Sequence, residues 1–159
     1  MTAPNALEAA VLREIVDWAL KLAQTRPMPI FTAAILKDGS ELCRAQNRVA
    51  ETCDPTRHAE IEAMARAGAL LETPDLEGCT LIASCQPCEM CLAAMRWAGI
   101  GRVVFAATQA NIGPAYFQFP RLGIADLCAA SGDAFSYHGG QEEHRALPLY
   151  SGRHGPGST

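Results

Sequence analysis

Two short stretches of the sequence hold residues that could perform chemistry. SCQPCEMC, residues 84–91, contains three cysteines, and DPTRHAE, residues 54–60, contains a histidine and a glutamate. Cys88 and Cys91 stand three residues apart, so at the start of a helix both thiols lie on one face, where the helix dipole favours thiolates. Two such thiolates form half of a zinc site. A structural zinc needs two more protein ligands, whereas a catalytic zinc needs one more and keeps a position open for water.

His58 is the candidate third ligand. Taken alone, a histidine after a turn is more often a surface or capping residue, and a lone C-x-x-C is more often a redox pair or a structural knuckle. Together the two stretches form H-x-E…P-C-x-x-C, a pattern typical of zinc deaminases that act on nucleobases. In that pattern Glu60 is not a ligand but moves protons between water, a ring nitrogen and the leaving ammonia. As an alternative, Glu60 is a first-turn carboxylate that stabilises the helix dipole.

The neighbouring cysteines and carboxylates are interpreted without a role in the chemistry. Cys85 is predicted to be a core residue or one that packs around the ligands, because a fourth protein ligand would close the position that water needs. Glu62 and Glu89 are predicted to be solvated. The remaining cysteines are predicted to be small buried apolar residues: Cys43, Cys53, Cys79 and Cys128.

Composition restricts the class of protein. The chain has 159 residues, 49% of them apolar and 19% charged, which predicts one domain over residues 1–150, with the Gly/Ser/Pro-rich residues 151–159 as a disordered tail. A formal net charge of −4 with two lysines argues against a nucleic-acid partner, because binding a polyanion depends on positive charge. The sequence has no apolar run of the length that spans a bilayer. An odd number of cysteines and no cationic leader predict the cytoplasm.

Hydrophobic periodicity places these residues on alternating helices and strands. Residues 6–25 have helical spacing, and residues 30–49 are typical of a hairpin around Asp38-Gly39. Further helices are expected at residues 58–67, 88–98 and 124–131, and further strands at residues 79–84, 102–107 and 134–138. This order predicts an α/β fold, a three-layer α/β/α sandwich with a five-stranded mixed sheet.

On these motifs the sequence resembles the cytidine deaminase superfamily. AAILKDG, QNRV, DPTRHAE, SCQPCEMCLAAMRWA and RVVFAA look like segments of that family. Within it the chain looks most like the small bacterial guanine deaminases, through Ser84-Cys85, Trp97 and EEHRALPLY, and next like the tRNA adenosine deaminases. The resemblance implies Zn²⁺ as cofactor and a homodimer in which a partner helps to close the site.

The resemblance also implies substrate-binding residues. Asn47 matches an asparagine whose side chain hydrogen-bonds the bound base, and Asn111 stands where guanine deaminases carry an aspartate that holds the purine. Residues 111–119 are expected to be the lid that sets specificity. The full set predicted to contact substrate is Asn47, Ala33 through its backbone, Trp97, Asn111 and Phe31.

The sequence therefore predicts a hydrolytic deaminase, with guanine to xanthine plus ammonia as the expected reaction. Cytosine, another aminated heterocycle such as a triazine, and adenosine in tRNA are alternative substrates. An inactive binding module of deaminase fold and a purely structural zinc domain are alternatives of another class, and the complete set of three ligands and one acid argues against both. Guanine deaminases close the site with an aromatic residue on a C-terminal helix, whereas this chain ends soon after Tyr150.

Overall fold

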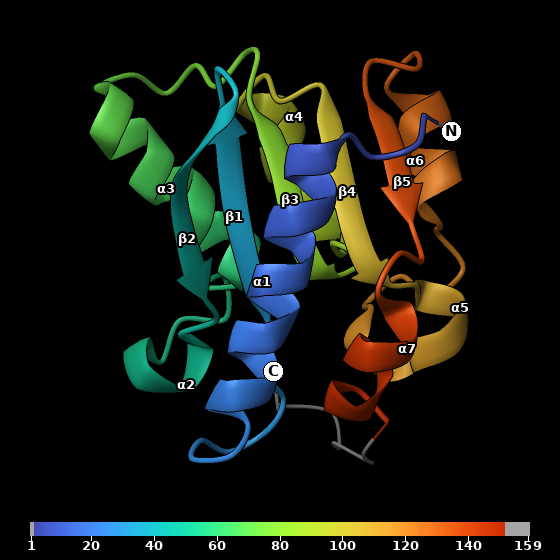
Figure 1. Cartoon of the computed structure of the whole chain (residues 1–159). Coiled ribbons are helices and arrows are strands. Elements are labelled where there is room, and N and C mark those ends of the chain that lie inside the picture. The colour runs from blue at the N-terminus through green and yellow to red at the C-terminus, as the bar shows by residue number, and fades with distance from the viewer. Residues whose placement is uncertain (1, 152–159) are drawn as a thin grey trace.

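The computed structural model describes residues 2–151 and contains a five-stranded mixed sheet between two layers of helices (Figure 1). The strands lie in the order β2-β1-β3-β4-β5. Strand β1 is antiparallel to β2 and β3, whereas β3, β4 and β5 are parallel. The strand bounds are β1 Thr32–Lys37, β2 Ser40–Gln46, β3 Thr80–Cys85, β4 Arg102–Ala107 and β5 Ser136–Gly139. The predicted three-layer α/β/α sandwich is confirmed.

Helices cover both faces of the sheet. Helices α1 and α7 pack on one face, and α3, α4 and α6 pack on the other (Figure 1). Strand β1 serves both cores, because successive side chains of a strand point to opposite faces: Ala34 and Leu36 join the core beneath α1, and Ala33 and Ile35 join the core beneath α3. The helix bounds are α1 Ala6–Leu22, α2 Val49–Thr52, α3 Ala59–Leu71, α4 Glu89–Trp97, α5 Gln109–Ile112, α6 Ile124–Ala130 and α7 Glu143–Ala146.

Helix α1 begins with a capping box that also ties it to the sheet. The Asn5 side chain accepts a hydrogen bond from the Glu8 backbone N–H, and the Glu8 side chain accepts one from the Asn5 backbone N–H. The same Glu8 carboxylate accepts from Arg102 Nε at 2.6 Å and Nη2 at 2.9 Å. This buried pair joins the first turn of α1 to the start of β4.

The hairpin predicted around Asp38-Gly39 is confirmed. Both residues have positive φ, 49° and 77°, as the two-residue turns that suit the twist of paired strands require. A register shift between Ile35 and Leu36 changes the pairing partway along the hairpin, so that Thr32 pairs with Gln46 at the far end. The end of the hairpin lies beside the start of α3, where the chemistry is expected.

Helix α3 is longer than predicted, and short helices occur in segments expected to be loops. We predicted that α3 ends near Gly68, but it continues to Leu71 and ends at Glu72, whose φ is 54°. Gly68 instead allows a close approach of the chain, because an added Cβ would lie 3.1 Å from the Thr73 carbonyl oxygen.

The short α2, α5 and α7 have too few residues to show a helical hydrophobic period.

Three further expectations concern the rest of the chain. Within residues 2–151, no helix combines the length and apolar character needed to cross a bilayer. The predicted tail lies outside the described residues, apart from Ser151, which is exposed. The predicted burial of the spare cysteines holds for Cys79 and Cys128; Cys43 is only half-buried, and the prediction is wrong for the exposed Cys53.

Candidate metal centre

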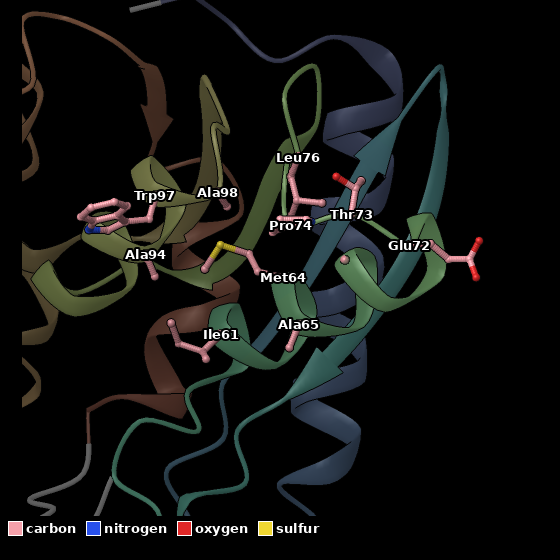
Figure 2. A pocket seen from close by; sticks show the side chains of 11 residues that line it. Ile61, Met64, Ala65, Glu72, Thr73, Pro74, Leu76, Ala94, Trp97 and Ala98 are labelled. Carbon is pink, nitrogen blue, oxygen red and sulfur yellow. The ribbon is translucent and has the colours of Figure 1, made fainter.

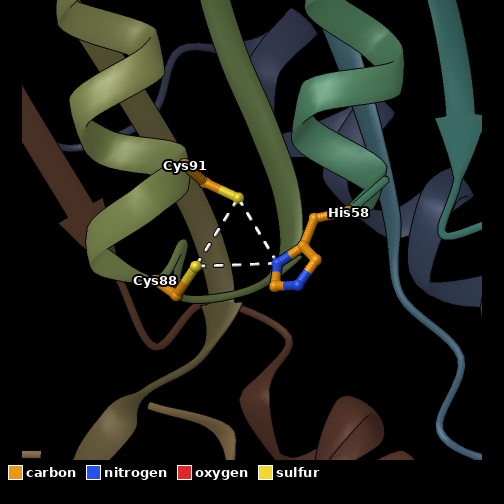
Figure 3. A group of neighbouring side chains, drawn as sticks. All are labelled: His58, Cys88 and Cys91. Carbon is orange, nitrogen blue, oxygen red and sulfur yellow. Dashed lines mark hydrogen bonds between the residues drawn. The ribbon is translucent and has the colours of Figure 1, made fainter. Parts of the chain in front are cut away.

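Two helix starts bring the predicted ligands together (Figure 3). His58 is the N-cap of α3, Cys88 is the N-cap of α4, and Cys91 lies in the first turn of α4. Neither N-cap side chain makes a capping hydrogen bond, and the imidazole and the Cys88 thiol lie next to each other. The Cys88 sulfur lies 3.6 Å from the Cys91 sulfur and 3.6 Å from His58 Nδ1, and the Cys91 sulfur lies 3.6 Å from the same nitrogen.

These distances match a tetrahedral zinc site. With Zn–S bonds of about 2.3 Å and a Zn–N bond of about 2.0 Å, tetrahedral angles place two sulfurs about 3.8 Å apart and a sulfur and a nitrogen about 3.5 Å apart. Two soft thiolates with one imidazole are also a donor set that zinc prefers. The residues present therefore fit zinc, held through Nδ1 of His58 and the two sulfurs.

The described residues supply three ligands and no fourth. Among the described residues, the one group of three or more donor atoms that all lie within 4.8 Å of one another comes from His58, Cys88 and Cys91. Cys85 is buried nearby but outside this group, and burial raises the pKa of its thiol well above the ordinary value. A three-ligand set leaves the fourth tetrahedral position open, as catalytic zinc sites do.

The cluster is electrostatically prepared for a cation. A hydrogen bond from the Cys91 thiol lowers the pKa of Cys88 to about 4, with help from His58 and against burial. That same bond, together with burial, raises the pKa of Cys91. Burial lowers the pKa of His58, but its hydrogen bond with Cys88 and the charge of Glu60 outweigh burial and leave the pKa raised. A lowered pKa favours the Cys88 thiolate, and metal binding displaces the remaining protons.

Glu60 is a buried carboxyl beside the ligands. It lies in the first turn of α3 and is 5% exposed. Burial raises the pKa of Glu60 to about 7, and the negative charge of Cys88 adds to the rise. Its Oε2 has no hydrogen-bond partner among residues 2–151. A carboxyl with a pKa near neutrality and a free oxygen is suited to accept and return protons.

A cavity of about 20 Å³ adjoins Glu60 and two of the ligands. That volume holds about one water molecule, and ordinary ligand pockets are far larger, roughly 300–1,000 Å³. The residues that line the cavity are Phe31, His58, Glu60, Cys85, Gln86, Cys88, Tyr116 and Phe117. The centre is therefore closed to a heterocyclic base in this conformation.

An aromatic cluster forms the roof of the cavity. Phe31 stacks on Tyr150 with ring centroids 5.0 Å apart, and Tyr116 packs edge-on against both rings at 5.7 and 6.0 Å. The Tyr150 hydroxyl donates to the Ile30 carbonyl at 3.0 Å and lies 2.7 Å from the Ser84 hydroxyl. These bonds fix Tyr150, and the stack then fixes Phe31 above the centre.

Of the five residues predicted to contact substrate, Phe31 alone lines the cavity. Asn47 holds Phe31 in place instead: its Oδ1 accepts from the Phe31 backbone N–H at 2.9 Å, and its backbone N–H donates to the Phe31 carbonyl at 3.1 Å. Ala33 is fully buried inside β1, between β2 and β3, and is not part of the cavity wall. Both positions support the wall rather than form it.

The structure does not bring Asn111 or Trp97 to the centre within one chain. The Asn111 side chain donates to Glu143 at 3.0 Å, which ties α5 to α7. Trp97 is 92% exposed and lies in a groove between α3 and α4 (Figure 2). Cys91 and Trp97 are six residues apart on one helix, about 9 Å along its axis, so a single chain places them near opposite ends of α4.

Sequence reasoning missed several residues around the centre. The prediction that Glu89 is solvated is wrong, because its Oε1 accepts from the backbone N–H groups of Gln118 and Phe119. The same prediction for Glu62 is wrong too: this carboxylate is 9% exposed and pairs with Arg57 at 3.3 Å. Two further contributions were missed: Gln86 lines the cavity, and Tyr150 stacks on Phe31. Of these, only Gln86 had a local signal, since it precedes the Pro-Cys pair directly.

Comparison with known proteins agrees with this geometry. Residues 8–107 match the family model described as the cytidine and deoxycytidylate deaminase zinc-binding region. The chain belongs to this family. The deaminase-family match includes all three candidate ligands and Glu60 and ends with β4, so the lid and Tyr150 lie beyond it.

Relatives of this family member carry several activities. The chain is 41% identical over 87 residues to the guanine deaminase of Bacillus subtilis (55% of this chain, 56% of that protein). It is 43% identical over 75 residues to the tRNA-specific adenosine deaminase of Aquifex aeolicus (47% and 50%). The chain thus spans about half the length of these curated relatives. A solved guanine deaminase from Nitrosomonas europaea, 24% identical, shares the fold with a TM-score of 0.77 over 94% of this chain and 84% of that one.

Proposed function

We propose that the chain is a zinc-dependent hydrolytic deaminase of a nucleobase or nucleoside, with guanine to xanthine plus ammonia as the first reaction to test. The observation that carries the proposal is the position of Glu60. Its buried carboxyl has a free oxygen beside a centre of three donors. A purely structural zinc site needs neither a free acid nor an open position.

The residues of the chain divide the reaction between them. Zinc held by His58, Cys88 and Cys91 would supply a Lewis acid that makes water a nucleophile near neutral pH. Glu60 takes one proton from the attacking water at its free oxygen and gives it to a ring nitrogen of the base; it then takes the second proton of that same oxygen and gives it to the amino group as ammonia leaves. Burial raises the pKa of Glu60, and a raised pKa suits a carboxyl that must both accept and donate protons. The aromatic roof excludes other water from the ring.

The choice of guanine depends on the likeness to guanine deaminases. Asn111, expected near the purine, is occupied by Glu143, and Glu60 supplies the one carboxylate among the described residues that line the cavity. Cytosine, a triazine and adenosine in tRNA therefore belong in the test. The net charge of −4 favours a small aminated heterocycle over a nucleic acid as partner.

We propose a homodimer formed through the groove between α3 and α4. This groove has a volume of about 710 Å³ and is lined by Ile61 and Met64 of α3 and by Ala94 and Trp97 of α4, all labelled in Figure 2. A tryptophan that is 92% exposed beside an apolar groove is typical of a contact surface, and a twofold interface pairs such a face with itself.

We further propose that residues 1–150 form one deaminase domain in the cytoplasm, where the seven free cysteines stay reduced.

Ammonia release from a substrate panel tests the function. The full chain, loaded with zinc and with its metal content measured, is incubated with guanine, cytosine, adenine, an aminotriazine, their available nucleosides and tRNA. We expect release from at least one free base or nucleoside, and a loss of about 10²–10⁴-fold in Glu60→Gln with zinc unchanged. Glu62→Gln, a matched change of a buried carboxylate in the same turn, should keep turnover within a few-fold. Full activity in Glu60→Gln would refute the proposed mechanism. Ammonia release from tRNA and from no other compound would show that tRNA, and not a free base, is the substrate.

A further inference from the structure

Residues 113–121, which overlap the segment expected to be a lid but begin after α5, cover the metal centre and are called the lid here. Tyr116 and Phe117 of this segment are buried and line the cavity beside Glu60. Tyr116 also packs edge-on against Phe31 on the opposite wall. Because the enclosed volume is about 20 Å³, far below that of a ligand pocket, a base reaches the centre only after this segment moves.

One side chain fastens the lid to the helix that carries the ligands. Glu89, the first residue of α4, accepts hydrogen bonds from the backbone N–H of Gln118 at 2.8 Å and of Phe119 at 3.1 Å. Hydrogen bonds to a carboxylate are stronger than those between neutral groups. In the described part of the chain the lid has a second, longer link, from Gln109 Nε2 to the Pro120 carbonyl at 3.5 Å.

Some buried polar atoms beneath and within the closed lid make no hydrogen bond to the described part of the protein. Three buried polar atoms around it lack hydrogen-bond partners among residues 2–151: Glu60 Oε2, Glu89 Oε2 and the Tyr116 hydroxyl. Burying unpaired polar atoms is unfavourable, so the two bonds to Glu89, together with the packing of Tyr116, must offset this cost when the lid is closed. Two hydrogen bonds can break and re-form without unfolding the rest of the domain, as the opening of a lid requires.

We propose that Glu89 is a positioning residue that latches the lid, and that a base enters only when its two hydrogen bonds to residues 118 and 119 break. The latch itself stands on geometry, and its consequence for catalysis rests on the deaminase function proposed above. A competing role for Glu89 is purely electrostatic: a negative charge at the start of α4 and near His58 stabilises the helix dipole and a cation.

Three substitutions separate the two roles. Glu89→Asp keeps the charge, but its side chain is one methylene shorter and does not reach both amides. Glu89→Gln loses the charge but keeps an oxygen at the same reach. Glu89→Ala loses both. Gln118→Ala is the control within the lid, because it changes an exposed side chain and leaves both amide bonds in place.

Amide hydrogen exchange at Gln118 and Phe119 in the zinc-loaded full chain is the direct measurement. The latch predicts exchange about tenfold faster or more in the Asp and Ala variants, the factor expected for losing a hydrogen bond to a charged acceptor, and only a few-fold faster in the Gln variant. Chymotrypsin cleavage after Tyr116 or Phe117, both buried in the closed lid, should increase in the same order. Zinc content, measured in every variant, should not change.

Two exchange results would overturn the latch: unchanged protection in Glu89→Ala, or loss of protection in Glu89→Gln with full protection in Glu89→Asp. Ammonia release gives a second arm, in which kcat/KM should fall about tenfold in the Asp variant and far less in the Gln variant. A wild-type chain that releases no ammonia from any base would refute the proposed function, and the exchange data would still decide the latch.

Discussion

Replacing Tyr150 by Phe should destabilise the protein far more than the loss of one oxygen atom suggests. Tyr150 is 2% exposed, and its hydroxyl lies 3.0 Å from the Ile30 carbonyl and 2.7 Å from the Ser84 hydroxyl. Phenylalanine keeps the ring that stacks on Phe31 at 5.0 Å, so the substitution isolates the hydroxyl. It removes the tyrosine donor from the Ile30 carbonyl and leaves the Ser84 hydroxyl with only the hydrogen bond that it accepts from the Thr32 backbone N–H, at about 1–3 kcal/mol for each buried group that loses a partner. Allowing for relaxation, we expect a loss of about 2–4 kcal/mol in the free energy of unfolding.

Urea unfolding of the zinc-loaded proteins, at equal protein and zinc concentrations, measures this loss. The same difference should lower Tm by about 5–15 °C. Tyr137→Phe is the matched control, because Tyr137 is only partly buried, and it should stay within about 0.5 kcal/mol of wild type. In a double-mutant cycle with Ser84→Ala, the two losses should be less than additive, since both remove the same bond. A stability for Tyr150→Phe within about 0.5 kcal/mol of wild type would refute the role assigned to this hydroxyl.

Three further predictions follow from the same structure. Cys91→Ala should weaken zinc binding by more than the roughly 10–100-fold loss that follows when a residue supporting a ligand is removed. Cys85→Ala, which changes a buried cysteine outside the donor group, should bind zinc as the wild type does. Zinc affinities are measured by competition with a chelator, and equal affinities of the two variants would contradict the ligand assignment. Burial raises the pKa of Glu8, but the hydrogen bonds from Arg102 and from the Asn5 backbone outweigh burial, so that the pKa lies below its ordinary 4.5. Because the pKa of Glu8 is lower in the folded than in the unfolded state, its stabilisation is complete above the unfolded pKa and is lost as the pH falls through the folded pKa. Glu8→Gln should therefore lower the free energy of unfolding by about 1.5–3 kcal/mol at pH 7 and by progressively less in acid. A loss that does not change with pH would argue against the ion pair with Arg102. Trp97→Glu should convert the proposed dimer into a monomer by size exclusion with light scattering, and a dimer that persists would place the interface elsewhere.

The metal centre could be predicted from sequence because its geometry is local. His58 and Glu60 share one helix start, Cys88 and Cys91 share another, and helical spacing alone aligns each pair. Only one long-range fact was needed, that the two helix starts meet. An alternating α/β order already favours that meeting, because such chains gather their functional residues at one edge of the sheet.

The surroundings of the centre depend on details that sequence patterns do not carry. Asn47 faces Phe31 because the hairpin shifts its register between Ile35 and Leu36, and a shift of one residue moves every later pair. Asn111 and Glu143, 32 residues apart, meet only once α7 packs beside β4. Glu89 was interpreted as solvated because its partners are backbone N–H groups, and every non-proline residue has one, so no sequence motif marks them.

The chain thus separates the groups that react from most of the groups that restrict access to them. The ligands and Glu60 stand on helix starts within residues 8–107, the part that matches the deaminase family. Tyr116 and Phe117, which line the cavity, come after that part, and so does Tyr150, which packs against Tyr116 and Phe31; of these aromatic residues only Phe31 lies within it. Burial is also the main reason that the pKa of Glu60 rises to about 7, and the roof residues line the cavity beside this carboxyl. Enclosure and proton transfer are therefore coupled: a lid that stayed open would admit a base easily but would return water to the carboxyl and lower its pKa toward the ordinary value.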